Sequence, residues 1–111
     1  MKNVKTCILL ASYNGGKYIE QQVKSIINQT YGDWKLIIRD DGSNDNTMKI
    51  LRSFSLKDKR IEIMNDDGEN LGAFGNFYRL TEYANEHYVP DYILYSDQDD
   101  FWFEDKVKIL L

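Results

Sequence analysis

The sequence has little cysteine, proline or histidine, with one of each in 111 residues. Cys7 has no partner for an internal disulfide, so a hydrophobic core must stabilise the fold, and a buried free thiol fits a reducing compartment. A single proline excludes a proline-rich linker. Hydrophobic residues (42%) and charged residues (29%) have the balance of a globular protein, not of a disordered one. We expect one domain spanning residues 1–111.

Long apolar segments and basic clusters are also missing. The apolar segment nearest the start, Cys7 to Ala11, is too short for a signal peptide or a membrane span. Asp and Glu outnumber Lys and Arg by 18 to 14, and the net charge of −4 disfavours nucleic-acid binding, which needs clustered cations. We therefore expect a cytoplasmic protein, with the inner face of the membrane as an alternative location.

Short apolar segments alternate with helical patterns along the chain. The expected strands are residues 6–11, 35–39, 61–64 and 92–95. The expected helices are residues 17–28, a helix capped by Asp45, and a helix whose stripe includes Phe74, Phe77, Tyr78, Thr81 and Ala84. Most of this last stripe is predicted to be core, and the nearby Asn76 is a candidate to face a ligand crevice. The alternation predicts an α/β fold with a mostly parallel sheet and helices on both faces.

Twelve of the eighteen acidic residues fall into three groups, and the core of each group lies just after an expected strand. The groups are Asp40, Asp41 and Asp45; Asp66, Asp67 and Glu69; and Asp91, Asp97, Asp99, Asp100, Glu104 and Asp105. In an open parallel sheet the carboxyl ends of the strands line the ligand crevice. Gathered carboxylates repel one another and require a counter-cation, and Mg²⁺ or Mn²⁺ would suit their oxygen atoms. The alternative is that these residues only form turns.

Four motifs follow the expected strands in order. They are Ala11-Ser12-Tyr13-Asn14, Arg39-Asp40-Asp41-Gly42-Ser43-Asn44-Asp45-Asn46-Thr47, Glu69-Asn70-Leu71-Gly72 and Tyr95-Ser96-Asp97-Gln98-Asp99-Asp100. In this order and spacing they closely resemble the N-terminal half of family 2 glycosyltransferases, which have the Rossmann-like GT-A fold. The resemblance covers nearly the whole chain.

The resemblance implies a role for each matching residue. Ala11 and Tyr13 would lie against the nucleotide base, Asp41 would accept a hydrogen bond from a uracil or thymine, and Asp40 would lie beside it. Asn70 and Gly72 would approach the sugar nucleotide. Asp97-Gln98-Asp99 matches the family's Asp-x-Asp motif: Asp99 would ligate a Mn²⁺ or Mg²⁺ ion that bridges the two phosphates, and Asp97 would face the ribose or the metal.

The reaction that the resemblance implies is metal-assisted transfer of a hexose or rhamnose. The sugar would pass from a UDP- or dTDP-linked donor to a hydroxyl of a saccharide or lipid-linked acceptor, with inversion, in cell-surface polysaccharide or glycoconjugate synthesis. In the family, the general base comes from segments after the Asp-x-Asp motif, so we expect it beyond Leu111 and name no catalytic residue. Leu111 falls within an apolar run, which predicts a truncated chain. A donor-binding module without turnover is the alternative.

Other acidic-site folds fit the sequence poorly. A phospho-receiver domain needs an acidic pair after its first strand, where this chain has Ala11-Ser12-Tyr13-Asn14. A haloacid-dehalogenase-type phosphatase needs an Asp-x-Asp element early in the chain, followed by Thr or Val, whereas here the element is late and Phe101 takes that position. Gly15-Gly16 lacks the pattern of a phosphate-binding loop and predicts a turn. Oligomeric state stays open.

Overall fold

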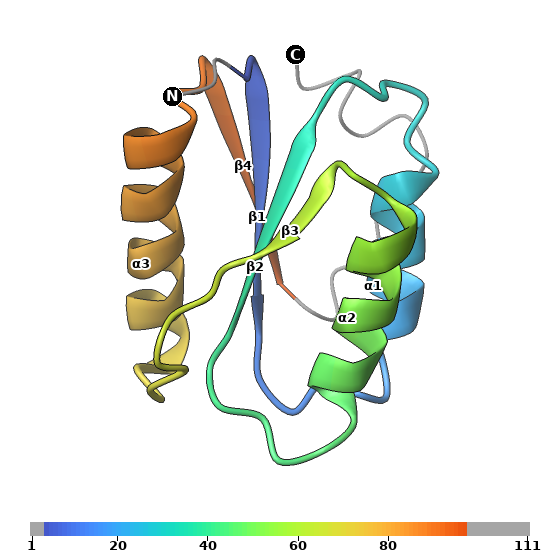
Figure 1. Ribbon diagram of the computed structural model, residues 1–111, viewed down its shortest axis with the longest axis vertical. Coiled ribbons are helices and arrows are strands. Elements are labelled where there is room, and N and C mark those ends of the chain that lie inside the picture. Colours follow the sequence, from blue (N-terminus) through green and yellow to red (C-terminus); the bar gives the residue numbers. More distant parts are fainter. Residues whose placement is uncertain (1–3, 98–111) are drawn as a thin grey trace.

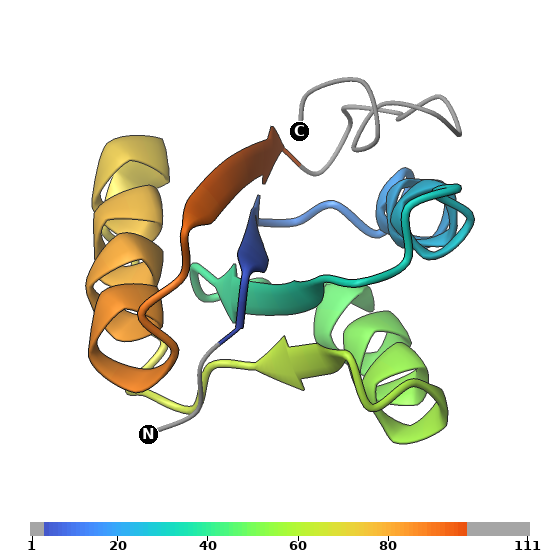
Figure 2. The same ribbon diagram turned by 90° about the horizontal axis from the view of Figure 1, so that it is seen from above.

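A computed structural model describes residues 4–97 as one parallel sheet covered by three helices (Figure 1). The elements are β1 (Thr6–Ser12), α1 (Ile19–Ile27), β2 (Lys35–Asp40), α2 (Thr47–Lys57), β3 (Ile61–Ile63), α3 (Gly72–His87) and β4 (Tyr92–Asp97). The strand order is β3-β2-β1-β4. In Figure 2, α3 covers one face of the sheet, and α1 and α2 cover the other. The predicted α/β class and the helices on both faces are confirmed.

The central strand β1 is buried at every residue, because it has a strand on each side and helices over both faces. Its alternate side chains supply two separate cores. Ile8 and Leu10 join the core under α1 and α2, whereas Cys7 and Leu9 join the core under α3. Burial raises the pKa of the Cys7 thiol to about 11, so Cys7 is an inert part of the core, as the sequence predicts.

The face that the third helix turns to the sheet only partly matches the predicted stripe: Ala84 is buried and Phe77 packs against the core, as predicted. Its buried residues are Asn76, Leu80 and Ala84, whereas Phe74 is 86% exposed and Tyr78 is 58% exposed. The prediction that the aromatic stripe is mostly core is therefore wrong for these two residues. The buried side chains are spaced four residues apart and include a small alanine and an amide. A pattern based on hydrophobicity gives the larger aromatic residues more weight than their positions on this helix justify.

The second helix begins later than predicted. Its N-cap is Asn46, not Asp45. The side chain of Asn46 makes no capping hydrogen bond to the helix. Asp45 Oδ1 instead accepts hydrogen bonds from the Thr47 N–H and hydroxyl, so Asp45 forms a turn just before the helix. Of the helices in residues 4–97, none combines the length and the apolar character needed to cross a membrane.

We predict a large loss of stability for one substitution on α3 and almost none for another. Leu80→Ala leaves a cavity in the core under the helix and is expected to lower the free energy of unfolding by about 2–5 kcal/mol. Phe74→Ser changes an exposed side chain and is expected to stay within about 0.5 kcal/mol of the wild type. Urea unfolding followed by far-UV circular dichroism measures both. A loss for Phe74→Ser as large as that for Leu80→Ala would contradict this packing of α3.

Candidate functional site

The end of β2 sends consecutive side chains to opposite faces of the sheet. Ile37 belongs to the core under α3, and the alternation of the strand carries Arg39 to the same face. Arg39 contacts Asn76 of α3, and Asp41 lies two residues further along. Asp40 faces the other way and lines a hollow of about 710 Å³ with Met48 and Arg52 of α2. The paired aspartates of the sequence therefore face two different environments.

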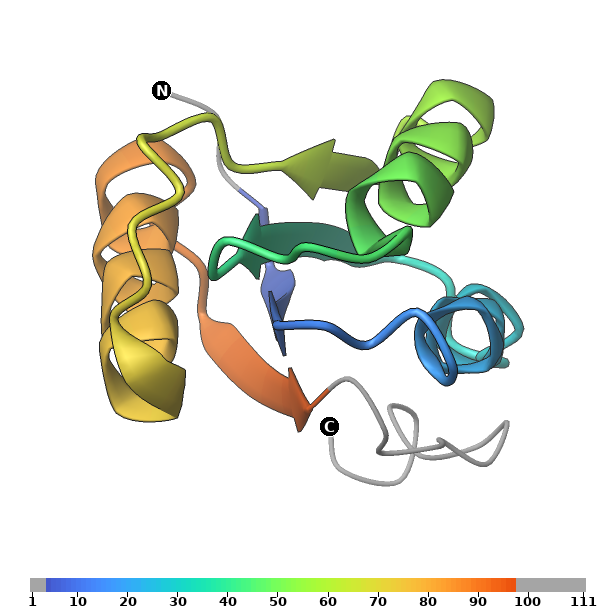
Figure 3. The same ribbon diagram turned by 90° about the horizontal axis from the view of Figure 1, so that it is seen from below.

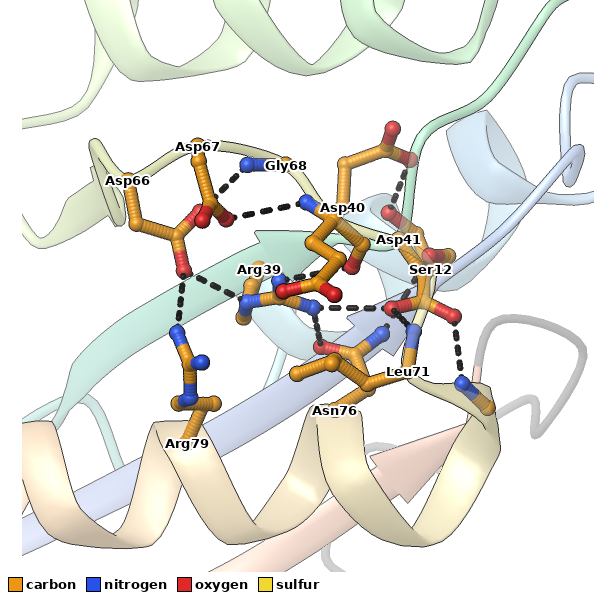
Figure 4. Close-up of polar contacts among 12 residues, drawn as sticks. Ser12, Arg39, Asp40, Asp41, Asp66, Asp67, Gly68, Leu71, Asn76 and Arg79 are labelled. Atoms are coloured by element: carbon orange, nitrogen blue, oxygen red, sulfur yellow. Dashed lines mark hydrogen bonds and ion pairs between the residues drawn. The ribbon is translucent and has the colours of Figure 1, made fainter.

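The guanidinium of Arg39 joins three segments of the chain at the carboxyl edge of the sheet (Figure 4). Its side chain is 0% exposed. Nη1 donates to Asp41 Oδ1 at 2.8 Å and to Asn76 Oδ1 at 3.3 Å. Nε donates to Asp66 Oδ2 at 2.7 Å, and Nη2 donates to the Glu69 carbonyl at 2.9 Å. Four of the five donors of this side chain are therefore used within one fixed arrangement.

Arg39 is the counter-cation for two of the predicted acidic groups. Burial alone would lower the pKa of Arg39, but its hydrogen bonds with Asp66 and Asp41 outweigh that effect and raise it. For Asp66, burial would raise the pKa, but the hydrogen bonds from Arg39 and from the Gly68 N–H lower it. Arg79 adds a second, more distant cation at 3.7 Å from Asp66. One carboxylate from each of the first two acidic groups, Asp41 and Asp66, therefore meets at Arg39, and this cation stabilises both.

Asp41 connects the end of β2 to the start of α3. Besides Arg39, its carboxylate accepts the Leu71 N–H at 2.9 Å and the Gly72 N–H at 2.9 Å. These N–H groups belong to the N-cap and the first residue of α3, where the helix leaves donors without partners and favours negative charge. Gly72 has a φ of +80°, a conformation that residues with a side chain rarely adopt. The aspartate therefore caps α3 from a distant strand.

A cavity of about 270 Å³ opens beside Asp41, between the ends of β1 and β2 and the first turns of α3. Five of the predicted substrate-binding residues line it: Ala11, Tyr13, Asp41, Asn70 and Gly72. Ser12, Ala73 and Asn76 complete the lining. Asp41 uses three of the roughly four acceptor positions of a carboxylate, so one remains for a ligand donor. Figure 3 views the loops at this carboxyl edge from below.

The other predicted site residues are placed differently. Asp40 does not line this cavity, because its side chain follows the strand alternation to the opposite face and binds Ser12 and Ser43. Asp97 ends β4, and its backbone pairs in register with Ala11, next to the cavity. The side chain of Asp97, and Gln98 and Asp99 entirely, lie outside the described residues.

Within residues 4–97, no group of three or more His, Cys, Asp or Glu side chains could hold a metal ion. Five carboxylates of the first two groups are bound to arginine, hydroxyl or backbone N–H groups instead: Asp40, Asp41, Asp45, Asp66 and Asp67. Asp97 and Asp99, the metal ligands that the family resemblance implies, are not tested by this search, because the side chain of Asp97 and all of Asp99 lie outside the described residues.

Sequence reasoning missed the role of Arg39 and noted only that Asn76 might face the crevice. Asn76 does line the cavity, and its side chain joins Arg39 to the Ser12 carbonyl. The signal for Arg39 was present: this cation directly follows three apolar residues of the strand and directly precedes two aspartates. A buried strand has room for such a charge only where carboxylates can pair with it.

We predict that Arg39→Met lowers the free energy of unfolding by about 3–5 kcal/mol, because it leaves Asp41 and Asp66 buried without their cation. Arg79→Gln is the matched control. Its side chain is 37% exposed and its ion pair spans 3.7 Å, so a change below about 0.5 kcal/mol is expected. Urea denaturation followed by far-UV circular dichroism measures both. Equal midpoints for the two variants would contradict the central role of Arg39.

A curated relative shares much of this sequence. The chain is 46% identical over 101 residues to "dTDP-rhamnosyl transferase RfbG" of Shigella flexneri, a match that covers 89% of this chain and 34% of the relative. The chain therefore spans about a third of the length of that relative.

Solved structures share the fold. The S. aureus TarS fragment 1–349 in complex with UDP-GlcNAc superposes with a TM-score of 0.75 at 22% identity, over 96% of this chain and 30% of that one. The mannosyltransferase PcManGT of Pyrobaculum calidifontis, in complex with GDP-Man and Mn²⁺, superposes with a TM-score of 0.70 at 16% identity, over 89% of this chain and 28% of that one. At these identities the likeness is one of fold, and it confirms the expected GT-A-type architecture.

The family model for glycosyl transferase family 2 matches residues 7–111, which is nearly the whole sequence. The chain therefore belongs to glycosyl transferase family 2.

Proposed function

We propose that this chain forms the donor-binding part of a glycosyltransferase that uses a UDP- or dTDP-linked sugar. The observation that carries the proposal is the cavity of about 270 Å³ in which Ala11, Tyr13, Asp41, Asn70 and Gly72 meet. These residues come from three separate segments, and each was expected at a nucleotide-sugar site before the fold brought them together. Hexosyl and rhamnosyl donors both remain open, and the 46% identity with a dTDP-rhamnosyl transferase supports a dTDP-linked sugar.

The nucleotide base is assigned to the cavity between β1 and α3. A uracil or thymine carries an imide N–H that can donate to the free acceptor position of Asp41. A base without that donor would leave the nearly buried carboxylate without a full set of partners, which gives selectivity. Tyr13 is 42% exposed on the cavity rim and offers a ring for stacking on the base.

The diphosphate is assigned to the carboxyl end of β4. Asp97 and Asp99 would hold a Mn²⁺ or Mg²⁺ ion there, which supplies positive charge for the leaving diphosphate. The mannosyltransferase PcManGT, which has a similar fold, was solved in complex with Mn²⁺, and this supports a divalent ion. Arg39 is unavailable to phosphate, because it is fully buried and bound to Asp41 and Asp66.

The acceptor half of the reaction is proposed to depend on sequence that this chain does not contain. The relative is about three times as long as the matched part, and we assign the general base of an inverting transfer to that further sequence. An acceptor hydroxyl of a saccharide or lipid-linked saccharide and a role in cell-surface polysaccharide synthesis are part of the proposal. The proposal also includes a cytoplasmic location, with the inner face of the membrane as the location if the acceptor is lipid-linked. The second candidate is a donor-binding module without turnover.

Calorimetric titration with UDP and dTDP, with and without Mn²⁺, tests the donor site. We predict metal-dependent binding by the wild-type chain and loss of the metal-dependent part in Asp99→Ala. Asp91→Ala removes the same charge from an exposed position before β4 and is expected to bind like the wild type. Unchanged Mn²⁺-dependent affinity in Asp99→Ala would overturn the metal assignment. The absence of binding to a folded wild-type chain would overturn the claim that this chain binds donor.

Base recognition is tested by comparing UDP with ADP. We predict that Asp41→Asn weakens UDP binding about tenfold or more, because a hydrogen bond to a charged group is lost, and that it weakens ADP binding much less. Asp67→Asn is the matched control, because Asp67 is exposed and its carboxylate accepts the Glu69 N–H outside the cavity. Far-UV circular dichroism must show that Asp41→Asn still folds, since Asp41 also caps α3. An equal loss for both nucleotides would show that Asp41 does not read the base.

A further inference from the structure

The two loops that follow β1 and β2 are tied together by their own side chains. The Asn14 N–H donates to Ser43 Oγ at 2.8 Å, and Asn14 Oδ1 accepts the Asn44 N–H at 2.7 Å. Further along, the Gly16 N–H donates to Asp45 Oδ2 at 3.0 Å. A side-chain carbon at Gly16 would lie 2.0 Å from Asn46 Oδ1, so the loops are in close contact. We call residues 12–16 and 40–46, joined in this way, the loop clamp.

Asp40 is the centre of the loop clamp. Its Oδ1 accepts the Ser12 hydroxyl at 2.7 Å and the Ser43 hydroxyl at 2.6 Å, and its Oδ2 accepts the Ser43 N–H at 2.8 Å. A carboxylate serves well here because all three of its partners are donors. The side chain that was predicted to bind substrate is therefore occupied in joining the two loops.

The loop clamp fixes the chain on both sides of Tyr13. Before it, the Ser12 hydroxyl is bound to Asp40, and the Ser12 carbonyl accepts the Asp41 N–H at 2.8 Å. After it, both the backbone and the side chain of Asn14 are bound to residues 43 and 44. Asn14 has a φ of +48°, a left-handed conformation that asparagine tolerates better than most residues. The backbone of Tyr13 therefore has little freedom, although its side chain lies at an exposed cavity rim.

We propose that Asp40, Ser43 and Asn14 are positioning residues that hold Tyr13 at the cavity and so determine how well the site binds a nucleotide base. This inference rests on the proposed donor function of the cavity. Asp40 thus contributes to donor recognition without touching the donor: Asp41 faces the base, and Asp40 fixes the aromatic residue beside it. An aromatic ring whose position is fixed before the ligand arrives binds a base more tightly than a mobile ring, because less conformational entropy is lost on binding.

The test compares Ser43→Ala, which removes the hydroxyl between Asp40 and Asn14, with Ser43→Thr, which keeps it. The control Ser53→Ala makes the same change at an exposed position on α2. We expect Ser43→Ala to weaken UDP binding about fivefold, the effect of one lost hydrogen bond, and to leave Mn²⁺-pyrophosphate binding within about twofold. Ser43→Thr and Ser53→Ala should bind UDP like the wild type. A parallel loss for UDP and pyrophosphate, or no loss for UDP, would overturn the proposal.

A second measurement keeps the inference separate from the donor function. In the nucleotide-free chain, NMR should show the Asn14 and Asn44 amides protected from hydrogen exchange in the wild type and in Ser43→Thr. Ser43→Ala should lose that protection at Asn14 and shift the ring resonances of Tyr13. Unchanged Tyr13 resonances in a folded Ser43→Ala chain would overturn the positioning role. If the wild type bound no UDP, the proposed function would fail, and these resonances would still decide whether the loop clamp holds Tyr13.

Discussion

The buried guanidinium of Arg39 is the interaction on which the carboxyl edge of this sheet depends. A fully buried cation is costly unless its donors are satisfied, and here β2, the loop after β3 and the first turns of α3 all supply acceptors. Because these partners come from segments far apart in the sequence, one side chain fixes their relative positions. It also neutralises carboxylates that would otherwise repel one another.

The arrangement around Arg39 explains how an acidic edge can accept a negatively charged donor. Asp66 is paired with arginine, and Asp41 combines an arginine with two N–H groups at the start of α3. The cavity lining therefore carries less unpaired negative charge than the sequence suggests. What stays available at Asp41 is a directional acceptor, which suits a base with an N–H group better than it suits a phosphate.

Consecutive residues at the end of β2 have different roles on the two faces of the sheet. Arg39 and Asp41 lie on the α3 side, where the cavity opens, and Asp40 lies on the α2 side, where it joins the two loops. This division follows from the period of two in a strand. It also makes Asp40 and Asp41 unequal, although they are adjacent and chemically identical. The loop after β1 gains its rigidity from Asp40, and Tyr13 lies within that loop.

Sequence alone determined the order of the elements, because strands with continuous apolar residues and helices with one apolar stripe have different periods. It also determined which motifs end the strands, and with them five of the residues that line the cavity. The tertiary structure decided three features that a local sequence pattern cannot encode. It decided which face α3 buries, because the fit of Asn76, Leu80 and Ala84 against the sheet outweighs the hydrophobicity of Phe74 and Tyr78. It decided that Arg39 serves as the counter-cation, because its partners are about 30 residues or more away, apart from Asp41. It gave Asp40 and Asp41 their separate roles, because the loop after β1 and the start of α3, which supply partners to one or the other, are distant in sequence and only the fold brings them to the end of β2.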